Sequence, residues 1–176
     1  MIKLHLGCGT KHIDGYTNID VRYLPGVDEV NNIKFLRNYK ANSVDIIYAC
    51  HVLEHFSRWE YKTVLNRWFE LLKPGGILRL AVPNFSAICS HYIKNGDLPT
   101  IMGLLYGGQD YDENYHYTTF DYNSINNDLT QIGFSDIVEY NHKNTEHASV
   151  DDFSKSYLPH LDENGMLMSL NIEATK

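Results

Sequence analysis

The sequence has few cysteines and no long apolar run. Its three cysteines, Cys8, Cys50 and Cys89, are an odd number without C-x-x-C spacing, so neither a disulfide framework nor a thiolate zinc site is indicated. The first residues do not combine a basic segment with a long apolar region, as a signal peptide requires. No apolar run approaches membrane-spanning length. We therefore expect a cytoplasmic protein with no membrane association.

Positive charge is also scarce. The chain has 15 Lys and Arg against 22 Asp and Glu, a formal net charge of −7, and its basic residues form no stripe. Binding to nucleic acid or to an anionic membrane depends on Lys and Arg displacing counterions. These partners are disfavoured, and a small-molecule or glycan substrate is expected. Nothing in the sequence indicates an oligomeric state.

The length fits one domain. With 176 residues and 43% hydrophobic content, the chain can bury one sizeable core, so we expect a single domain over residues 1–176. Short apolar runs predict seven strands, at residues 2–6, 16–21, 27–30, 44–49, 77–82, 134–140 and 166–174. Periodicity and caps predict helices from Ser57, over 85–95 and 100–106, and around 125–132. This alternation predicts an α/β fold with a doubly wound, mostly parallel sheet and an antiparallel edge.

Several boundaries carry specific signals. Ser57 and Glu60 have capping-box spacing, which predicts a helix start at Ser57, and the run of residues 73–76 (KPGG) predicts its end. Residues 107–120 predict a surface loop, and residues 141–165 a long polar connector. The link between the first two strands leaves little room for a crossover helix, so we expect that helix to be short or absent.

A glycine turn, Gly7-Cys8-Gly9, follows the first strand. Glycines let backbone amides approach a ligand at the carboxyl edge of an open α/β sheet. A dinucleotide-binding fingerprint would have a third glycine at position 12 and an acid about 20 residues further on, whereas this chain has His12 there and Asp20 comes sooner. Asp20 ends the second strand, where a carboxylate can accept hydrogen bonds from both hydroxyls of a ribose. A turn aspartate without this role is the alternative.

Several motifs follow one another in order: the strand with its glycine turn, Asp20, Asn32, the segment 51–55 and the turn at 72–76. In this order they resemble the class I S-adenosylmethionine-dependent methyltransferases, and within them a small group predicted to act in surface-polysaccharide or lipopolysaccharide biosynthesis. The resemblance spans nearly the full chain. It implies a Rossmann-like fold, S-adenosylmethionine as the cofactor, and methyl transfer to a small polar acceptor such as a sugar or glycan hydroxyl.

The resemblance also implies site residues. It assigns Gly7, Cys8 and Gly9 to the methionine part of the cofactor and Asp20 to the ribose. It assigns Asn32 and Ile33 to the adenine, and it places Cys50 and His51 beside the sulfonium. Many relatives carry Asp-Leu where this chain has Asn32-Ile33. The run 107–109 (GGQ), followed by His116, resembles the substrate loop of the small group.

A sugar hydroxyl must lose its proton when it is methylated, and a neutral imidazole with a pKa near 6.5 is suited to receive it. His55 and His116 are the catalytic candidates. Tyr111, Tyr115 and Tyr117 are then expected to pack on a sugar face. The alternative is a loop histidine without a catalytic role among ordinary surface aromatics.

The segment 51–55 (HVLEH) also matches H-x-x-E-H, by which inverted zinc peptidases place two histidines and a base on one helical face. No third ligand is evident, so a metallohydrolase is the less favoured alternative. Some methyltransferases hold magnesium through Glu-x-x-Glu-His here, but His51 replaces the first carboxylate and magnesium prefers oxygen. We expect no metal. A non-catalytic, cofactor-binding partner subunit with the same fold is a further alternative.

Overall fold

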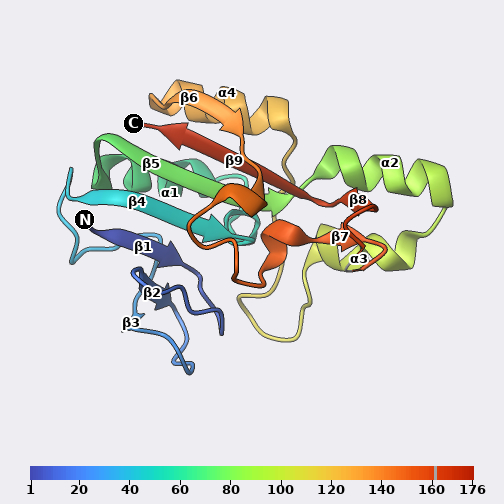
Figure 1. Ribbon diagram of the computed structural model, residues 1–176, viewed down its shortest axis with the longest axis horizontal. Coiled ribbons are helices and arrows are strands. Elements are labelled where there is room, and N and C mark those ends of the chain that lie inside the picture. Colours follow the sequence, from blue (N-terminus) through green and yellow to red (C-terminus); the bar gives the residue numbers. More distant parts are fainter. Residues whose placement is uncertain (161) are drawn as a thin grey trace.

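A seven-stranded sheet forms the centre of the computed structural model, which describes residues 1–160 and 162–176 (Figure 1). Its strands are β1 (Lys3–Leu6), β2 (Thr17–Asp20), β3 (Glu29–Val30), β4 (Val44–Cys50), β5 (Leu72–Pro83), β6 (Ser135–Glu139) and β9 (Ser169–Thr175), in the order β3-β2-β1-β4-β5-β9-β6. The first five pair in parallel, whereas β9 is antiparallel to β5 and β6. The predicted α/β fold is confirmed. The antiparallel pair lies at the expected edge, with β9 one position inward from β6.

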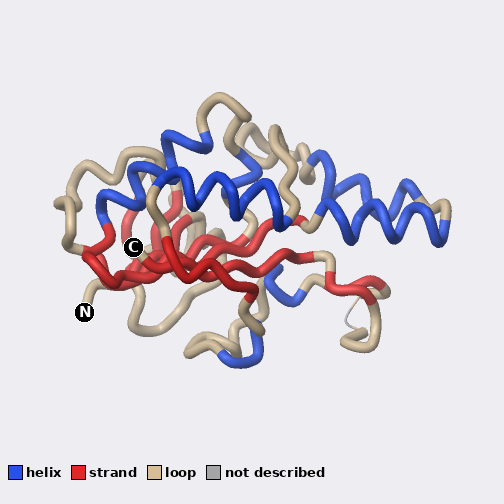
Figure 2. Tube along the Cα trace, turned by 90° about the horizontal axis from the view of Figure 1, so that it is seen from above, coloured by secondary structure: helices blue, strands red, loops and turns tan. Residues whose placement is uncertain are grey.

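The two faces of the sheet are covered differently (Figure 2). Helices α1 (Tyr61–Leu71) and α4 (Tyr122–Ile132) pack on one face, where Trp68 and Leu129 are fully buried in the main core. Irregular segments cover the other face, and there Tyr48 of β4 packs with Ile13 and Val150. Helices α2 (Phe85–Asn95) and α3 (Leu98–Tyr106) form a hairpin beyond the end of β5 (Figure 1).

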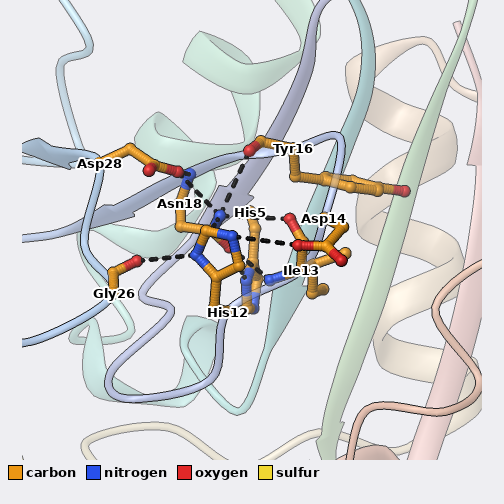
Figure 3. A network of polar contacts seen from close by, with 8 residues as sticks. All are labelled: His5, His12, Ile13, Asp14, Tyr16, Asn18, Gly26 and Asp28. Atoms are coloured by element: carbon orange, nitrogen blue, oxygen red, sulfur yellow. Dashed lines mark hydrogen bonds and ion pairs between the residues drawn. The ribbon is translucent and has the colours of Figure 1, made fainter.

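No helix connects β1 to β2, as the short link predicted, and a buried side chain holds the link instead (Figure 3). Asn18 of β2 accepts a hydrogen bond from the amide of Ile13 at 2.9 Å and lies 3.0 Å from Nδ1 of His5. Its Nδ2 donates to the carboxylate of Asp28 at 2.8 Å and to the carbonyl of Tyr16 at 3.2 Å. A buried side-chain amide whose hydrogen bonds are all satisfied holds the surrounding chain in place. The link therefore returns to β2 without a helix.

The predicted start of the first long helix was wrong. Helix α1 begins at Tyr61, and no side chain caps its first turn. The hydroxyl of Ser57 donates to the carboxylate of Glu60 at 2.9 Å, and its carbonyl accepts from the amides of Glu60 and Tyr61. Residues 57–60 form a turn before the helix. The helix ends at Leu71, and β5 begins at once at Leu72, earlier than the apolar run at 77–82 indicated.

The predicted final strand at 166–174 was wrong as one element, because the structure divides it into β8 (Met166–Leu167) and β9, which belong to different sheets. Most of the other elements follow the prediction. Helix α2 has the predicted bounds, with Asn84 accepting from the amides of Ser86 and Ala87, and residues 107–120 form a loop. The connector contains the short 3-10 helices η2 (His142–Asn144) and η3 (Phe153–Lys155) and the strand β7 (Tyr157–Leu158), which pairs with β8 (Met166–Leu167). Among the described residues, no helix is both long and apolar enough to cross a membrane.

Candidate functional site

The carboxyl ends of β1, β2 and β4 meet at one edge of the sheet, where open α/β folds bind their ligands. Two cavities open there, cavity A of about 330 Å³ and cavity B of about 720 Å³. The residues that line both of them are Gly7, Arg22, His51, His55 and Tyr111. The two cavities are therefore neighbouring parts of one cleft.

The glycine turn after β1 is tightly packed. Gly7 has a φ of +63°, and a Cβ there would lie 2.5 Å from a methyl carbon of Val52. Gly9 also has a positive φ, of +54°, and its amide donates to the carboxylate of Asp20 at 2.8 Å. The turn therefore depends on glycine at position 7, and through Gly9 it is tied to the end of β2.

Asp20 is buried at the wall of cavity A. One carboxylate oxygen accepts from Gly9, and the other accepts from the amide of Arg22 at 2.9 Å and from its Nε at 3.2 Å. The guanidinium of Arg22 also lies 4.1 Å from the ring centre of Tyr111. Sequence reasoning did not identify Arg22, because a lone arginine after a strand carries no motif. Its contact with Tyr111 joins the loop 107–120 to the end of β2.

Asn32 and Ile33 form another wall of cavity A. The side-chain oxygen of Asn32 accepts from the amide of Lys34 at 3.0 Å, and the carbonyl of Ile33 accepts from the indole of Trp68 at 2.9 Å. The hydrogen bond from Trp68 thus attaches this segment to helix α1. The structure places both predicted adenine residues in the same cavity as Asp20.

Cys8 and Cys50 line cavity B. Burial raises the pKa of the Cys8 thiol to about 12, and it raises the pKa of Cys50 well above its ordinary value. A thiol with a raised pKa stays protonated at neutral pH and is a poor nucleophile. These two residues therefore shape the cavity wall.

His51 directly follows β4 in an uncommon backbone conformation, with a φ of +52°. Its ring lies between two polar side chains, with Nδ1 3.5 Å from Oε1 of Glu54 and Nε2 3.3 Å from the hydroxyl of Ser169. Burial lowers the pKa of His51 to about 3, so the ring is neutral at physiological pH. It faces both cavities.

Three side chains of the types that bind metal ions lie close together near His51. Glu54, His55 and His116 each offer one atom, and these three atoms lie within 4.8 Å of one another. Burial raises the pKa of Glu54 to about 8, lowers the pKa of His116 to about 4 and lowers the pKa of His55. The structure thus brings together the two predicted catalytic histidines from distant parts of the chain, and it adds Glu54.

Backbone carbonyls orient both histidines. Nδ1 of His55 lies 3.1 Å from the carbonyl of Tyr115, and Nδ1 of His116 lies 3.0 Å from the carbonyl of Leu104. A neutral imidazole must donate to a carbonyl, so the proton is assigned to Nδ1 in both rings. The lone pair of each ring is therefore on Nε2, and both rings line cavity B.

The helical arrangement of the H-x-x-E-H alternative is not formed. His51 ends a strand, and only the 3-10 turn η1 (Leu53–His55) follows it. The two histidines of the motif are thus not one helical turn apart on one face. The histidine that joins Glu54 and His55 in the compact group is His116, which the motif does not contain.

The tyrosines of the loop 107–120 are not equivalent. Tyr111 lines both cavities, whereas Tyr115 and Tyr117 stack on each other, with ring centres 6.4 Å apart, and line neither. The two glycines of the loop have a packing reason, because a Cβ on Gly107 or Gly108 would lie 2.3 to 2.4 Å from atoms of Asn114.

The connector forms the far wall of cavity B, a role that the sequence did not reveal. The lining residues that it supplies are Asp152, Phe153, Ser156, Tyr157, Leu158 and His160. Asp152 accepts from the hydroxyl of Tyr48 at 2.7 Å, which fixes this wall to β4. A polar segment without periodicity gives no signal of such a position.

Comparisons with known proteins agree with this geometry. Residues 4–80, less than half of the chain, match the family model of a methyltransferase domain, and this segment contains Asp20, Asn32, His51 and His55. No curated protein matches the sequence.

Solved structures share the fold over 99% of this chain. A SAM-dependent methyltransferase from Archaeoglobus fulgidus is 16% identical, with 85% of its chain covered and a TM-score of 0.59. The Burkholderia thailandensis 1,6-didemethyltoxoflavin-N1-methyltransferase, solved with bound 1,6-didemethyltoxoflavin and S-adenosylhomocysteine, is 17% identical, with 70% covered and a TM-score of 0.62. An S-adenosylmethionine-dependent methyltransferase from Mesorhizobium loti is 13% identical, with 90% covered and a TM-score of 0.56.

At these identities the structural likeness establishes the fold. The family match over residues 4–80 indicates the class of enzyme. Together they support the prediction of a SAM-dependent methyltransferase.

Proposed function

We propose that this protein is a methyltransferase that uses S-adenosylmethionine to methylate a hydroxyl of a small polar acceptor, a sugar or a glycan. The observation that carries the proposal is the layout of the cleft. Asp20, Asn32 and Ile33 line cavity A alone, His116 lines cavity B alone, and the residues shared by both include Gly7, His51 and His55. His55 and His116 are neutral, with the lone pair of each ring on Nε2. A cofactor site and an acceptor site are thus side by side.

The glycine turn and the end of β2 fit the cofactor. Each oxygen of Asp20 is held by the protein yet keeps acceptor capacity for a ribose hydroxyl. Gly9 leaves open space, since only the end of Arg22 comes within 4 Å of a Cβ placed there. The residues that we propose to hold the cofactor are Gly7, Cys8, Gly9, Asp20, Asn32, Ile33, Cys50 and His51.

When bound, S-adenosylmethionine supplies a methyl group already activated on a positively charged sulfur. The chain itself then has to hold the acceptor oxygen in line and keep water away from it. Cys50 and His51 are placed to contribute to both, because they lie at the end of β4 and line cavity B. Neither side chain is charged at neutral pH, since burial shifts the pKa of both away from ionisation.

The proposed catalytic residues are His55 and His116. Both are neutral near pH 7, because burial lowers their pKa, and both present Nε2 as the atom with a lone pair. A lone pair at the wall of cavity B is placed to act on the proton of an acceptor hydroxyl. Burial also makes an imidazolium unstable here, so each ring is a weaker base than a free imidazole.

The lining of cavity B supports a sugar as the acceptor. Asp152, Ser156 and Thr100 offer hydrogen-bonding side chains, and Tyr111 offers a ring between the two cavities. The formal charge of −7 disfavours nucleic acid. A role in surface-polysaccharide biosynthesis in the cytoplasm is part of the proposal and rests on the resemblance of the sequence motifs.

Activity measurements test the proposal. Purified protein is incubated with S-adenosylmethionine and a panel of monosaccharides, nucleotide sugars and oligosaccharides, and formation of S-adenosylhomocysteine is measured. We expect turnover with at least one member of the panel. Cofactor binding without turnover on any member would favour the non-catalytic partner subunit instead.

A further inference from the structure

Glu54 is a buried carboxyl group beside the cleft that, in the described part of the chain, lacks hydrogen-bond partners. It is 1% exposed, and among the described residues neither carboxylate oxygen has a hydrogen-bond partner. The nitrogen atoms of basic side chains within 4 Å are Nδ1 of His51 at 3.5 Å and Nε2 of His116 at 3.9 Å. Both belong to imidazoles whose pKa is lowered by burial, so neither supplies a positive charge near pH 7. A carboxylate buried in this way is strongly destabilised unless it binds a proton or a cation.

The surrounding histidines are prepared to bind a cation. Metal-bound histidines usually donate their other ring N–H to a carbonyl or carboxylate, which fixes the tautomer. His55 and His116 make this contact through Nδ1, to the carbonyls of Tyr115 and Leu104. Their Nε2 lone pairs remain for a ligand, and the rings are neutral, as metal ligation requires.

We infer that Glu54, His55 and His116 form a binding site for one divalent transition-metal ion, with zinc as the best-matched ion. One oxygen of Glu54 and one nitrogen of each histidine lie within 4.8 Å of one another. Ligands on a tetrahedral zinc, at about 2.0–2.2 Å from the metal, are roughly 3.4 Å apart. To close onto the ion, the ligand atoms would have to approach one another by up to about 1.4 Å.

The donor set selects the class of ion. Magnesium and calcium prefer oxygen ligands in larger number, whereas two imidazoles and one carboxylate suit zinc and neighbouring transition metals. Three protein ligands are also the number found in catalytic zinc sites, which keep a fourth position open. Here the open position faces cavity B, because His55 and His116 both line it.

The consequence for the reaction rests on the proposed function. An acceptor hydroxyl that binds at the open position has its pKa lowered by the ion. Its O–H bond breaks and the proton passes to water in the cleft. The O–CH3 bond then forms as the C–S bond breaks, and the electron pair of the C–S bond stays on sulfur. With the ion bound, the Nε2 lone pairs of His55 and His116 coordinate it, so the ion replaces the two histidines as the group that acts on the hydroxyl.

Metal binding is tested directly on the intact chain after removal of metals with a chelator. Zinc chloride is titrated by calorimetry, and cobalt(II) by visible absorption, into wild type, Glu54→Gln and His116→Ala. We expect one equivalent of zinc with a micromolar or lower Kd in wild type. Loss of a ligand should weaken binding by at least roughly 100-fold, more than the 10- to 100-fold typical of outer-shell changes.

Matched controls are Glu139→Gln, at the exposed end of β6, and His91→Ala, on α2, both of which should bind zinc like wild type. Absence of zinc and cobalt binding by wild type would overturn the inference, as would unchanged binding by Glu54→Gln. If Glu54→Gln does not fold, the cobalt spectrum of wild type decides, because histidine and carboxylate ligands in a four-coordinate site give intense visible bands.

Titration of S-adenosylhomocysteine into the same metal-free proteins separates the two proposals. Wild type that binds S-adenosylhomocysteine but not zinc would remove the metal site and leave the methyltransferase proposal in place. Wild type that binds zinc but not S-adenosylhomocysteine would remove the methyltransferase proposal and leave the metal site in place.

Discussion

The rings of His55 and His116 pack edge to face, with 4.7 Å between their centres and 81° between their planes. This contact joins the turn after β4 to the loop 107–120, and the amide of Tyr117 strengthens it by donating to the carbonyl of Glu54 at 2.8 Å. The loop is thus attached to the turn after β4 by backbone and side chain together. Changes in the loop should therefore act on turnover.

Replacement of His116 by alanine should lower kcat by about 10² to 10⁴, the range typical of a lost proton-transfer group. The affinity for S-adenosylhomocysteine should stay within about threefold, because His116 is not among the residues that we propose to hold the cofactor. Product formation and calorimetric titration measure the two quantities on the same preparation. His91→Ala is the control, and an unchanged kcat in His116→Ala would remove this residue from the mechanism.

Gly7→Ala should strongly destabilise the fold, because the new Cβ would lie 2.5 Å from Val52 and the backbone has a φ of +63°. Gly75→Ala separates the two causes, since Gly75 has a φ of +77° but no atom within 4 Å of a Cβ. It should lose only about 1–2 kcal/mol, the conformational cost of a left-handed non-glycine residue. Urea unfolding measures both.

The double variant Gly7→Ala with Val52→Ala should recover part of the loss in Gly7→Ala, because it removes the methyl groups that clash. Equal destabilisation by Gly7→Ala and Gly75→Ala would show that close packing against Val52 does not constrain the turn.

The pH dependence of stability should change in Glu54→Gln. Burial raises the pKa of Glu54 from its ordinary 4.5 to about 8, so in the metal-free protein the native state holds this proton more tightly than the unfolded state. The resulting stability is fully present below about pH 4.5 and is lost as the pH rises through 8. Glutamine has no such loss.

The free energy of unfolding of Glu54→Gln should therefore rise relative to wild type between pH 5 and pH 8, by up to a few kcal/mol. Urea unfolding with chelator present measures this difference. The titrating histidines are common to both proteins and largely cancel. A difference between the proteins that does not vary with pH would show that Glu54 is not buried as described.

Much of the fold was predictable because it depends on local signals. Asn84 and Gly96 mark helix α2 at both ends, and the helix has the predicted bounds. The short link between β1 and β2 correctly indicated a missing helix. The start of α1 was not predictable, since Ser57 and Glu60 bond to each other instead of capping the backbone, and sequence spacing does not distinguish these two pairings.

The site was predictable where it lies on strand ends and not where it depends on loops. Asp20 ends β2 and His51 follows β4, and parallel strands bring their ends together. His116 meets Glu54 only because the loop 107–120 folds back onto η1, a long-range contact with no local pattern. The contact of Arg22 with Tyr111 arises in the same way.

The central claim is that Asp20 and the glycine turn bind the cofactor, and calorimetric titration of S-adenosylmethionine and S-adenosylhomocysteine tests it most directly. Wild type should bind both with micromolar Kd. Asp20→Ala should weaken binding by about 10- to 150-fold, equivalent to the loss of a charge-assisted hydrogen bond of 1.5–3 kcal/mol. Asp14→Ala, whose side chain is fully exposed, should bind like wild type. No binding by wild type, or equal binding by Asp20→Ala, would contradict the account.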